Sequence, residues 1–168
     1  MEKITVNEIP EMFDQVAIVF ADKKDELCEM DAAMGDGDLG LTMSKGYGAL
    51  PGFLRDNAAE GDIGKQLMKS GMKMQNEVPS TMGTLMSSGI MEAGKAFKGK
   101  VELVPADIAA YVTAFAAGIK KRGKCELGDR TILDSVHAGA EKAQALVDAN
   151  PDASFRDVIS AAVEGAHE

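Results

Sequence analysis

The segment Asp31-Ala-Ala-Met-Gly-Asp-Gly-Asp-Leu-Gly-Leu-Thr-Met43 places three carboxylates, Asp31, Asp36 and Asp38, within eight residues. The glycines among them disfavour a helix interior, so the segment predicts a tight loop between two helices in which the carboxylates converge. Crowded like charges are costly unless a cation lies among them, and hard oxygen ligands suit Mg²⁺ or Ca²⁺ better than zinc. We therefore predict a divalent-cation site, with helix capping and turn formation by Asp and Gly as the alternative.

Two well-known loop motifs do not fit this segment. Residues 35–40 match the pattern G-x-G-x-x-G, but no strand precedes them and carboxylates between the glycines would repel a bare pyrophosphate. A calcium-binding EF-hand needs an acidic residue at its twelfth position, where counting from Asp36 gives Tyr47. Two Mg²⁺ sharing the three aspartates and bridging to polyphosphate oxygens fit better.

The composition limits the class of protein. A chain of 168 residues predicts one domain, residues 1–168, with a core of its own. The net charge of −9 argues against nucleic-acid binding through a basic surface and against adsorption to anionic membranes. The two cysteines form neither a disulfide scaffold nor a metal motif. Without a signal peptide or a run of 18 apolar residues, we expect a cytoplasmic protein.

Apolar residues recur at three- and four-residue intervals along almost the whole chain, which is typical of amphipathic helices. Capping residues mark several helix starts: Asp62, Ser80 or Thr81, Asp129 and Ser154, with Pro105 opening a further helix that Gly123 ends. The pattern predicts seven helices, over residues 6–29, 39–50, 62–77, 81–97, 105–123, 130–149 and 155–168. Because only residues 101–104 look extended, the fold class is all-α, an antiparallel barrel or bundle with short loops.

Two further segments offer polar groups at helix starts. The free N–H groups and hydroxyls of residues 80–84 are a candidate anion site, although a Ser/Thr cap is routine there. Residues 123–131 form a glycine-bearing loop before the next helix, where Arg130 and Asp134 have the spacing of a helical ion pair. His137 lies beside an apolar face and is interpreted as packed. No Ser/His/Asp or Cys/His arrangement indicates nucleophilic catalysis.

Together these segments resemble the nucleotide-binding L subunit of the dihydroxyacetone kinase family. Residues 31–43 match the family's D-x-x-x-G-D-G-D-x-G-x-[NT]-M loop. Residues 78–85 match its V-G-G-A-S-G-x-L segment loosely, and residues 122–134 match R-G-K-x-x-x-G-D-[KR]-T-M-x-D. The resemblance runs in the same order over essentially the whole chain. Leu39 and Met82 depart from it, standing where histidine and serine are common.

The resemblance implies a barrel of eight helices that binds ADP or ATP at one end through two Mg²⁺, held by Asp31, Asp36 and Asp38. It implies that the first turn after the loop and the 80–83 turn line the phosphates, and that residues near 123 and 132 border the adenine and ribose. The implied nucleotide contacts are Leu39, Gly40, Leu41, Thr42, Ser80, Thr81, Met82, Gly83, Gly123 and Ile132. The family continues into a D-P-G-A motif, so we expect seven of its eight helices and weakened nucleotide binding here.

The activity implied by the resemblance is phosphate transfer to a small ketose such as dihydroxyacetone. The ketose would be held on a separate K-type substrate-binding subunit, and a phosphotransferase-type subunit fed by phosphoenolpyruvate is the donor in some members. No residue of this chain need act as a general base. Two alternatives stay open: a non-catalytic Mg-nucleotide-binding or regulatory module, and an acyl-phosphate-forming kinase domain.

Overall fold

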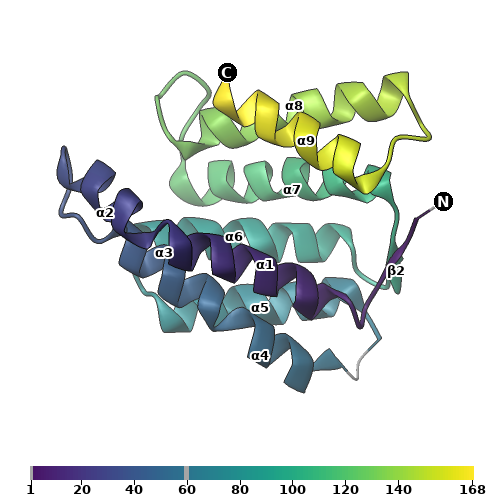
Figure 1. Ribbon diagram of the computed structural model, residues 1–168, viewed down its shortest axis with the longest axis horizontal. Helices are drawn as coiled ribbons and strands as arrows, with labels where there is room; N and C mark the ends of the chain where they lie inside the picture. Colours follow the sequence, from purple (N-terminus) through teal and green to yellow (C-terminus); the bar gives the residue numbers. More distant parts are fainter. Residues whose placement is uncertain (1, 59–60) are drawn as a thin grey trace.

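The protein is a bundle of antiparallel helices (Figure 1), and the all-α prediction is confirmed. The computed structural model describes residues 2–58 and 61–168. Within these residues the helices are α1 (Ile9–Asp22), α2 (Lys24–Ala32), α3 (Leu39–Gly48), α4 (Leu50–Asp56), α5 (Ile63–Glu77), α6 (Thr81–Ala96), α7 (Pro105–Gly123), α8 (Ile132–Ala149) and α9 (Phe155–His167). Two short strands, β1 (Ile4–Thr5) and β2 (Glu102–Leu103), pair antiparallel.

The described residues hold nine helical segments rather than the predicted seven, because two of the predicted helices are divided. The first breaks at Lys23, and the α2 segment that follows buries none of its residues, so the core-facing stripe of α1 does not continue through it. The second breaks at Ala49, and Pro51 takes an opening position of α4, where its missing N–H costs no helical hydrogen bond.

Small residues allow the middle helices to approach closely. A Cβ added at Gly118 of α7 would lie 2.5 Å from the carbonyl oxygen of Ser88 on α6. Between α5 and α6, Gly64 and Gly94 face one another, and a Cβ on Gly64 would lie 2.5 Å from the Gly94 oxygen. Backbone contact of this kind aligns α5, α6 and α7 in antiparallel order, so the start of α6 and the end of α7 reach the same end of the bundle.

The core runs along the inside of the bundle. Its largest fully buried apolar side chains come from α4, α5, α6, α7 and α8: Leu50, Leu54, Ile63, Met74, Ile90, Ile119 and Leu133. A smaller cluster beneath α9 joins Ile108 and Ala109 to Ala143, Ala153 and Val158. These apolar contacts hold the ends of the helices in fixed positions and so position the loops between them.

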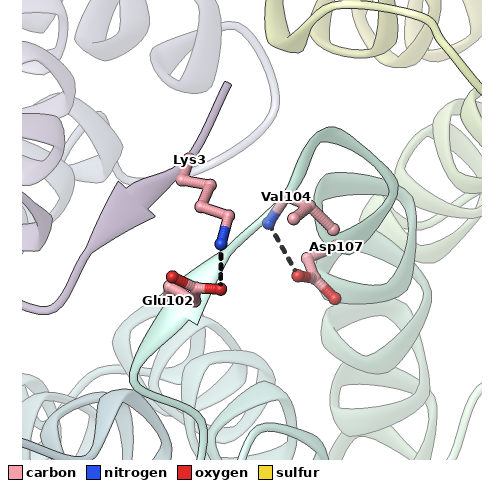
Figure 2. Close-up of polar contacts among 4 residues, drawn as sticks. All are labelled: Lys3, Glu102, Val104 and Asp107. Carbon is pink, nitrogen blue, oxygen red and sulfur yellow. Dashed lines mark hydrogen bonds and ion pairs between the residues drawn. The ribbon is translucent and has the colours of Figure 1, made fainter. Parts of the chain in front are cut away.

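The β1–β2 pair lies at the opposite end of the bundle from the α2–α3 and α7–α8 loops (Figure 1). The Lys3 ammonium lies 2.6 Å from the Glu102 carboxylate, and the Asp107 carboxylate accepts the Val104 N–H at 2.8 Å (Figure 2). Lys100 also pairs with Asp107. These contacts tie the N-terminal strand to the start of α7. Among the described helices, none is both long and apolar enough to cross a membrane.

Candidate functional site

The three predicted metal ligands come together in the α2–α3 loop. Asp31 lies in the last turn of α2, Asp36 and Asp38 follow in the loop, and one carboxylate oxygen of each lies within 4.8 Å of the others. The Asp31 Oδ2 accepts the N–H groups of Asp38 at 3.1 Å and Leu39 at 3.3 Å. Gly37 turns the chain with φ +76°, a conformation that side chains disfavour. The loop geometry therefore aims three hard oxygen donors at one point.

Electrostatic repulsion is present in this cluster. The Asp36 carboxylate, followed by partial desolvation and by Asp31, raises the pKa of Asp38 above its ordinary value. Asp31 is half-buried and the other two are exposed, so a cation could reach them from solvent. Three carboxylates that lie this close together form the oxygen-rich donor set that Mg²⁺ and Ca²⁺ prefer. The residues present thus fit a hard divalent cation.

The first turn of α3 connects this cluster to a hollow beside α6. Leu41 and Thr42 line a space of about 330 Å³ together with Lys45, Glu77 and the turn that precedes α6 (residues 78–80). Ser80 is the N-cap of α6, as predicted, and its Oγ accepts the Gly83 N–H at 3.1 Å. The turn that follows the carboxylate loop and the turn that precedes α6 therefore border the same hollow.

A larger pocket of about 600 Å³ lies on the other side of the same turn. Its lining comes from the turn before α6 and the start of that helix, the last two turns of α7, the loop after α7 and the start of α8: Pro79, Ser80, Thr81, Thr84, Leu85, Ile119, Arg122, Gly123, Cys125, Thr131 and Ile132. We call it the α6–α7–α8 pocket. Pro79 and Ser80 border both this pocket and the smaller hollow, so a single extended ligand could span the two.

The α7–α8 loop is held by Asp134, not by the predicted Arg130–Asp134 pair. The Asp134 carboxylate accepts the N–H of Gly128 at 2.6 Å and of Thr131 at 2.8 Å, and these bonds lower its pKa. The predicted cap Asp129 is also wrong: Thr131 is the N-cap of α8, and Asp129 accepts the Glu126 N–H instead. Backbone donors outcompete Arg130, whose own φ of +59° belongs to the turn.

The predicted nucleotide contacts fall into three groups. Ser80, Thr81, Gly123 and Ile132 line the α6–α7–α8 pocket, and Leu41 and Thr42 line the smaller hollow. The remaining four line neither. Leu39 and Met82 pack against the core, and a Cβ added at Gly40 or Gly83 would collide with the carbonyl oxygen of Lys24 or Val78, respectively. His137 is partly exposed, 3.5 Å from Glu141.

Thr84 lies in the predicted 80–84 anion segment and lines the pocket. Leu85 and Arg122 were not predicted as site residues, and they reach the pocket because α6 and α7 run antiparallel with Gly118 against Ser88. Thr131, interpreted only as part of a loop, lines the pocket as the cap of α8. Arg122 directly precedes the predicted contact Gly123 in the sequence, which places it near the site. Only the pairing of α6 and α7 shows which side of α7 faces the pocket.

Comparison with known proteins addresses the family directly. A family model described as a DAK2 domain matches residues 33–168, which include the pocket and two of the three aspartates. This chain belongs to the DAK2-domain family. The ADP-binding subunit DhaL of a PEP-dependent dihydroxyacetone kinase from Listeria innocua is 32% identical to this DAK2 domain over 146 residues, covering 86% of the chain and 68% of that subunit.

Longer proteins also contain a region similar to this DAK2 domain. Triokinase/FMN cyclase from Rattus norvegicus is 30% identical over 158 residues, which span 92% of this chain and 26% of that protein. The crystal structure of the dihydroxyacetone kinase of C. freundii superposes with a TM-score of 0.65 at 19% identity, over 95% of this chain and 32% of that one. This DAK2 domain thus corresponds to one part of such kinases and shares their helical fold.

Proposed function

We propose that this DAK2 domain binds ADP or ATP with Mg²⁺ and serves as the nucleotide-binding subunit of a dihydroxyacetone-type kinase. The observation that carries the proposal is the convergence of Asp31, Asp36 and Asp38 in the loop before α3, whose first turn lines a hollow that shares Ser80 with the α6–α7–α8 pocket. The similarity to ADP-binding subunits of dihydroxyacetone kinases supports it. A K-type subunit would hold the ketose, and a phosphotransferase-type subunit is a candidate phosphoryl donor.

In this proposal Asp31, Asp36 and Asp38 hold the metal, and bound Mg²⁺ neutralises charge on the terminal phosphates. Thr42 and Ser80 border the hollow that adjoins the first turn of α3. The free N–H groups at the start of α6 add the positive end of a helix dipole. Gly123 and Ile132 border the part of the pocket that would take the base and ribose.

The chain supplies positioning and charge neutralisation and needs no general base. Asp31 has a second task, because it also accepts two backbone N–H groups of the loop and so fixes where Asp38 lies. Ile119 and Ile132 provide apolar surface for a base, while Ser80 and Thr81 provide hydroxyls for phosphate oxygens. An apolar lining with a few polar groups that orient the ligand is typical of ligand pockets.

Isothermal titration with ADP, with and without Mg²⁺, tests the proposal. Asp36→Ala should abolish the Mg²⁺-dependent part of ADP affinity, while Asp56→Ala, an exposed aspartate at the end of α4, should not change it. Unchanged ADP affinity in Asp36→Ala would show that the site is assigned wrongly. Product formation with a K-type subunit, ATP and dihydroxyacetone then separates a kinase subunit from a non-catalytic nucleotide-binding module.

A further inference from the structure

Arg122 is the one charged residue among those that line the α6–α7–α8 pocket in the described part of the chain. The other ten lining residues are neutral, and none carries a carboxylate. The whole chain has a net charge of −9, whereas the side chains that line this pocket have a net charge of +1. The pocket also receives the starts of two helices, α6 at Ser80 and α8 at Thr131, whose dipoles favour negative charge. The pocket is thus suited to an anionic group.

The cations next to Arg122 have other partners. Lys120 pairs with Glu126 at 2.6 Å, and Lys121 acts on the Glu92 carboxylate, whose pKa it helps to lower. Neither of these lysines lines the pocket. Arg122 makes no hydrogen bond or ion pair with any residue that the structure describes. Its guanidinium is therefore free to offer its fork of N–H donors to an oxyanion, for which that fork is well shaped.

The helix pairing places Arg122 along the length of the pocket. Because Gly118 contacts Ser88 and Gly123 approaches Leu85, Arg122 lies opposite the second turn of α6. The smaller hollow, which the first turn of α3 borders, meets this pocket at Pro79 and Ser80. Arg122 does not line that hollow and shares the rest of the pocket with Gly123 and Ile132. Arg122 therefore lies in the part of the pocket proposed for the base and ribose, away from the hollow proposed for the terminal phosphates.

We propose that Arg122 binds the α-phosphate of the nucleotide, an inference that rests on the proposed function. The three aspartates would hold a metal that could neutralise the terminal phosphates, so positive charge for the phosphate next to the ribose must come from a group on α7. Arg122 supplies that charge without any metal. It therefore makes the pocket discriminate between adenosine and its 5′-phosphate, in EDTA as well as in Mg²⁺.

Displacement of a fluorescent ADP analogue by ADP, AMP and adenosine tests this inference on the full chain. Arg122→Ala should weaken ADP and AMP binding about tenfold or more, the usual effect of losing a charge-assisted hydrogen bond, and leave adenosine within about twofold. Arg122→Lys, which keeps the charge, should retain part of the AMP affinity. Lys121→Ala is the matched control, since it removes a cation from the same turn outside the pocket, and it should leave all three ligands within about twofold.

The possible outcomes separate the inference from the proposed function. An equal loss for adenosine and AMP in Arg122→Ala would assign Arg122 to the base or to the stability of the pocket and overturn the inference. Unchanged AMP affinity with weakened ADP affinity would move the contact to a terminal phosphate and overturn it as well. Failure of the wild-type chain to bind ADP with Mg²⁺ overturns the proposed function itself, whereas normal ADP binding by both wild type and Arg122→Ala overturns only the role of Arg122.

Discussion

Gly40→Ala is expected to damage the metal site without changing any of its ligands. Gly40 lies in the first turn of α3, where that helix packs against α2. A Cβ there would lie 1.8 Å from the Lys24 carbonyl oxygen, 2.7 Å from the Lys24 carbonyl carbon and 2.9 Å from the Cys28 sulfur. Two of these three atoms belong to the backbone of α2, so no side-chain rotation relieves the clash.

The size of the displacement follows from these contacts. The shortest contact must lengthen by about 1.6 Å to reach an ordinary separation of 3.4 Å. Because α2 buries none of its residues, we expect α2 to move rather than the core. Asp31 lies on α2 and moves with it, away from Asp38 at the start of α3. Since Mg²⁺ demands near-ideal geometry, the affinity of the variant for Mg²⁺ should fall about 10- to 100-fold. The overpacked contact should also lower the unfolding free energy by about 1–3 kcal/mol.

Titration calorimetry with Mg²⁺ in the presence of ADP measures the first effect, and urea unfolding measures the second. Gly48→Ala is the matched control, because Gly48 ends the same helix with no heavy atom within 4 Å of the added Cβ. It should leave Mg²⁺ affinity unchanged and raise the unfolding free energy by up to about 1 kcal/mol. Mg²⁺ affinity within twofold of wild type in Gly40→Ala would refute the argument that α2 carries Asp31 away.

Polar groups at three helix starts give further tests. Ser80→Ala should cost about 1 kcal/mol of unfolding free energy and weaken ADP binding, whereas Ser154→Ala, the equivalent cap of α9, should cost a similar amount with ADP affinity unchanged. Asp134→Asn should lower the Tm at pH 7. Because loop N–H groups lower the pKa of Asp134, its carboxylate stabilises the fold above its ordinary pKa of 3.8, and this effect disappears as the pH falls through the lowered value. Melting curves of the wild type and of Asp134→Asn should therefore converge in acid. Asp38→Asn should raise the metal-free Tm at pH 7. The raised pKa of Asp38 marks repulsion between carboxylates that is present above that pKa and relieved below it. Mg²⁺ should no longer raise the Tm of this variant.

Local chemistry made several features predictable from the sequence. Asp62, Ser80 and Ser154 cap the helices that they were expected to cap, because a cap is satisfied by N–H groups within three residues of it. The convergence of the three aspartates was predictable for the same reason: loop glycines and short spacing leave the carboxylates little freedom to separate. The family could be inferred from the same short segments, since the residues of each segment are close in the chain.

Other features depended on contacts between distant residues. The break at Lys23 follows from packing, since the apolar spacing continues while α2 leaves the core. The start of α8 at Thr131 instead of Asp129 depends on Asp134, which binds the N–H groups of the loop.

The sequence by itself determined the helical class, most helix boundaries and the carboxylate loop, because each depends on residues a few positions apart. Only the tertiary structure decided which side chains line the α6–α7–α8 pocket. Arg122 belongs to it because Gly118 packs against Ser88 and so sets the rotation of α7 against α6. Periodicity predicts that a helix has two faces, but the partner helix determines what each face meets.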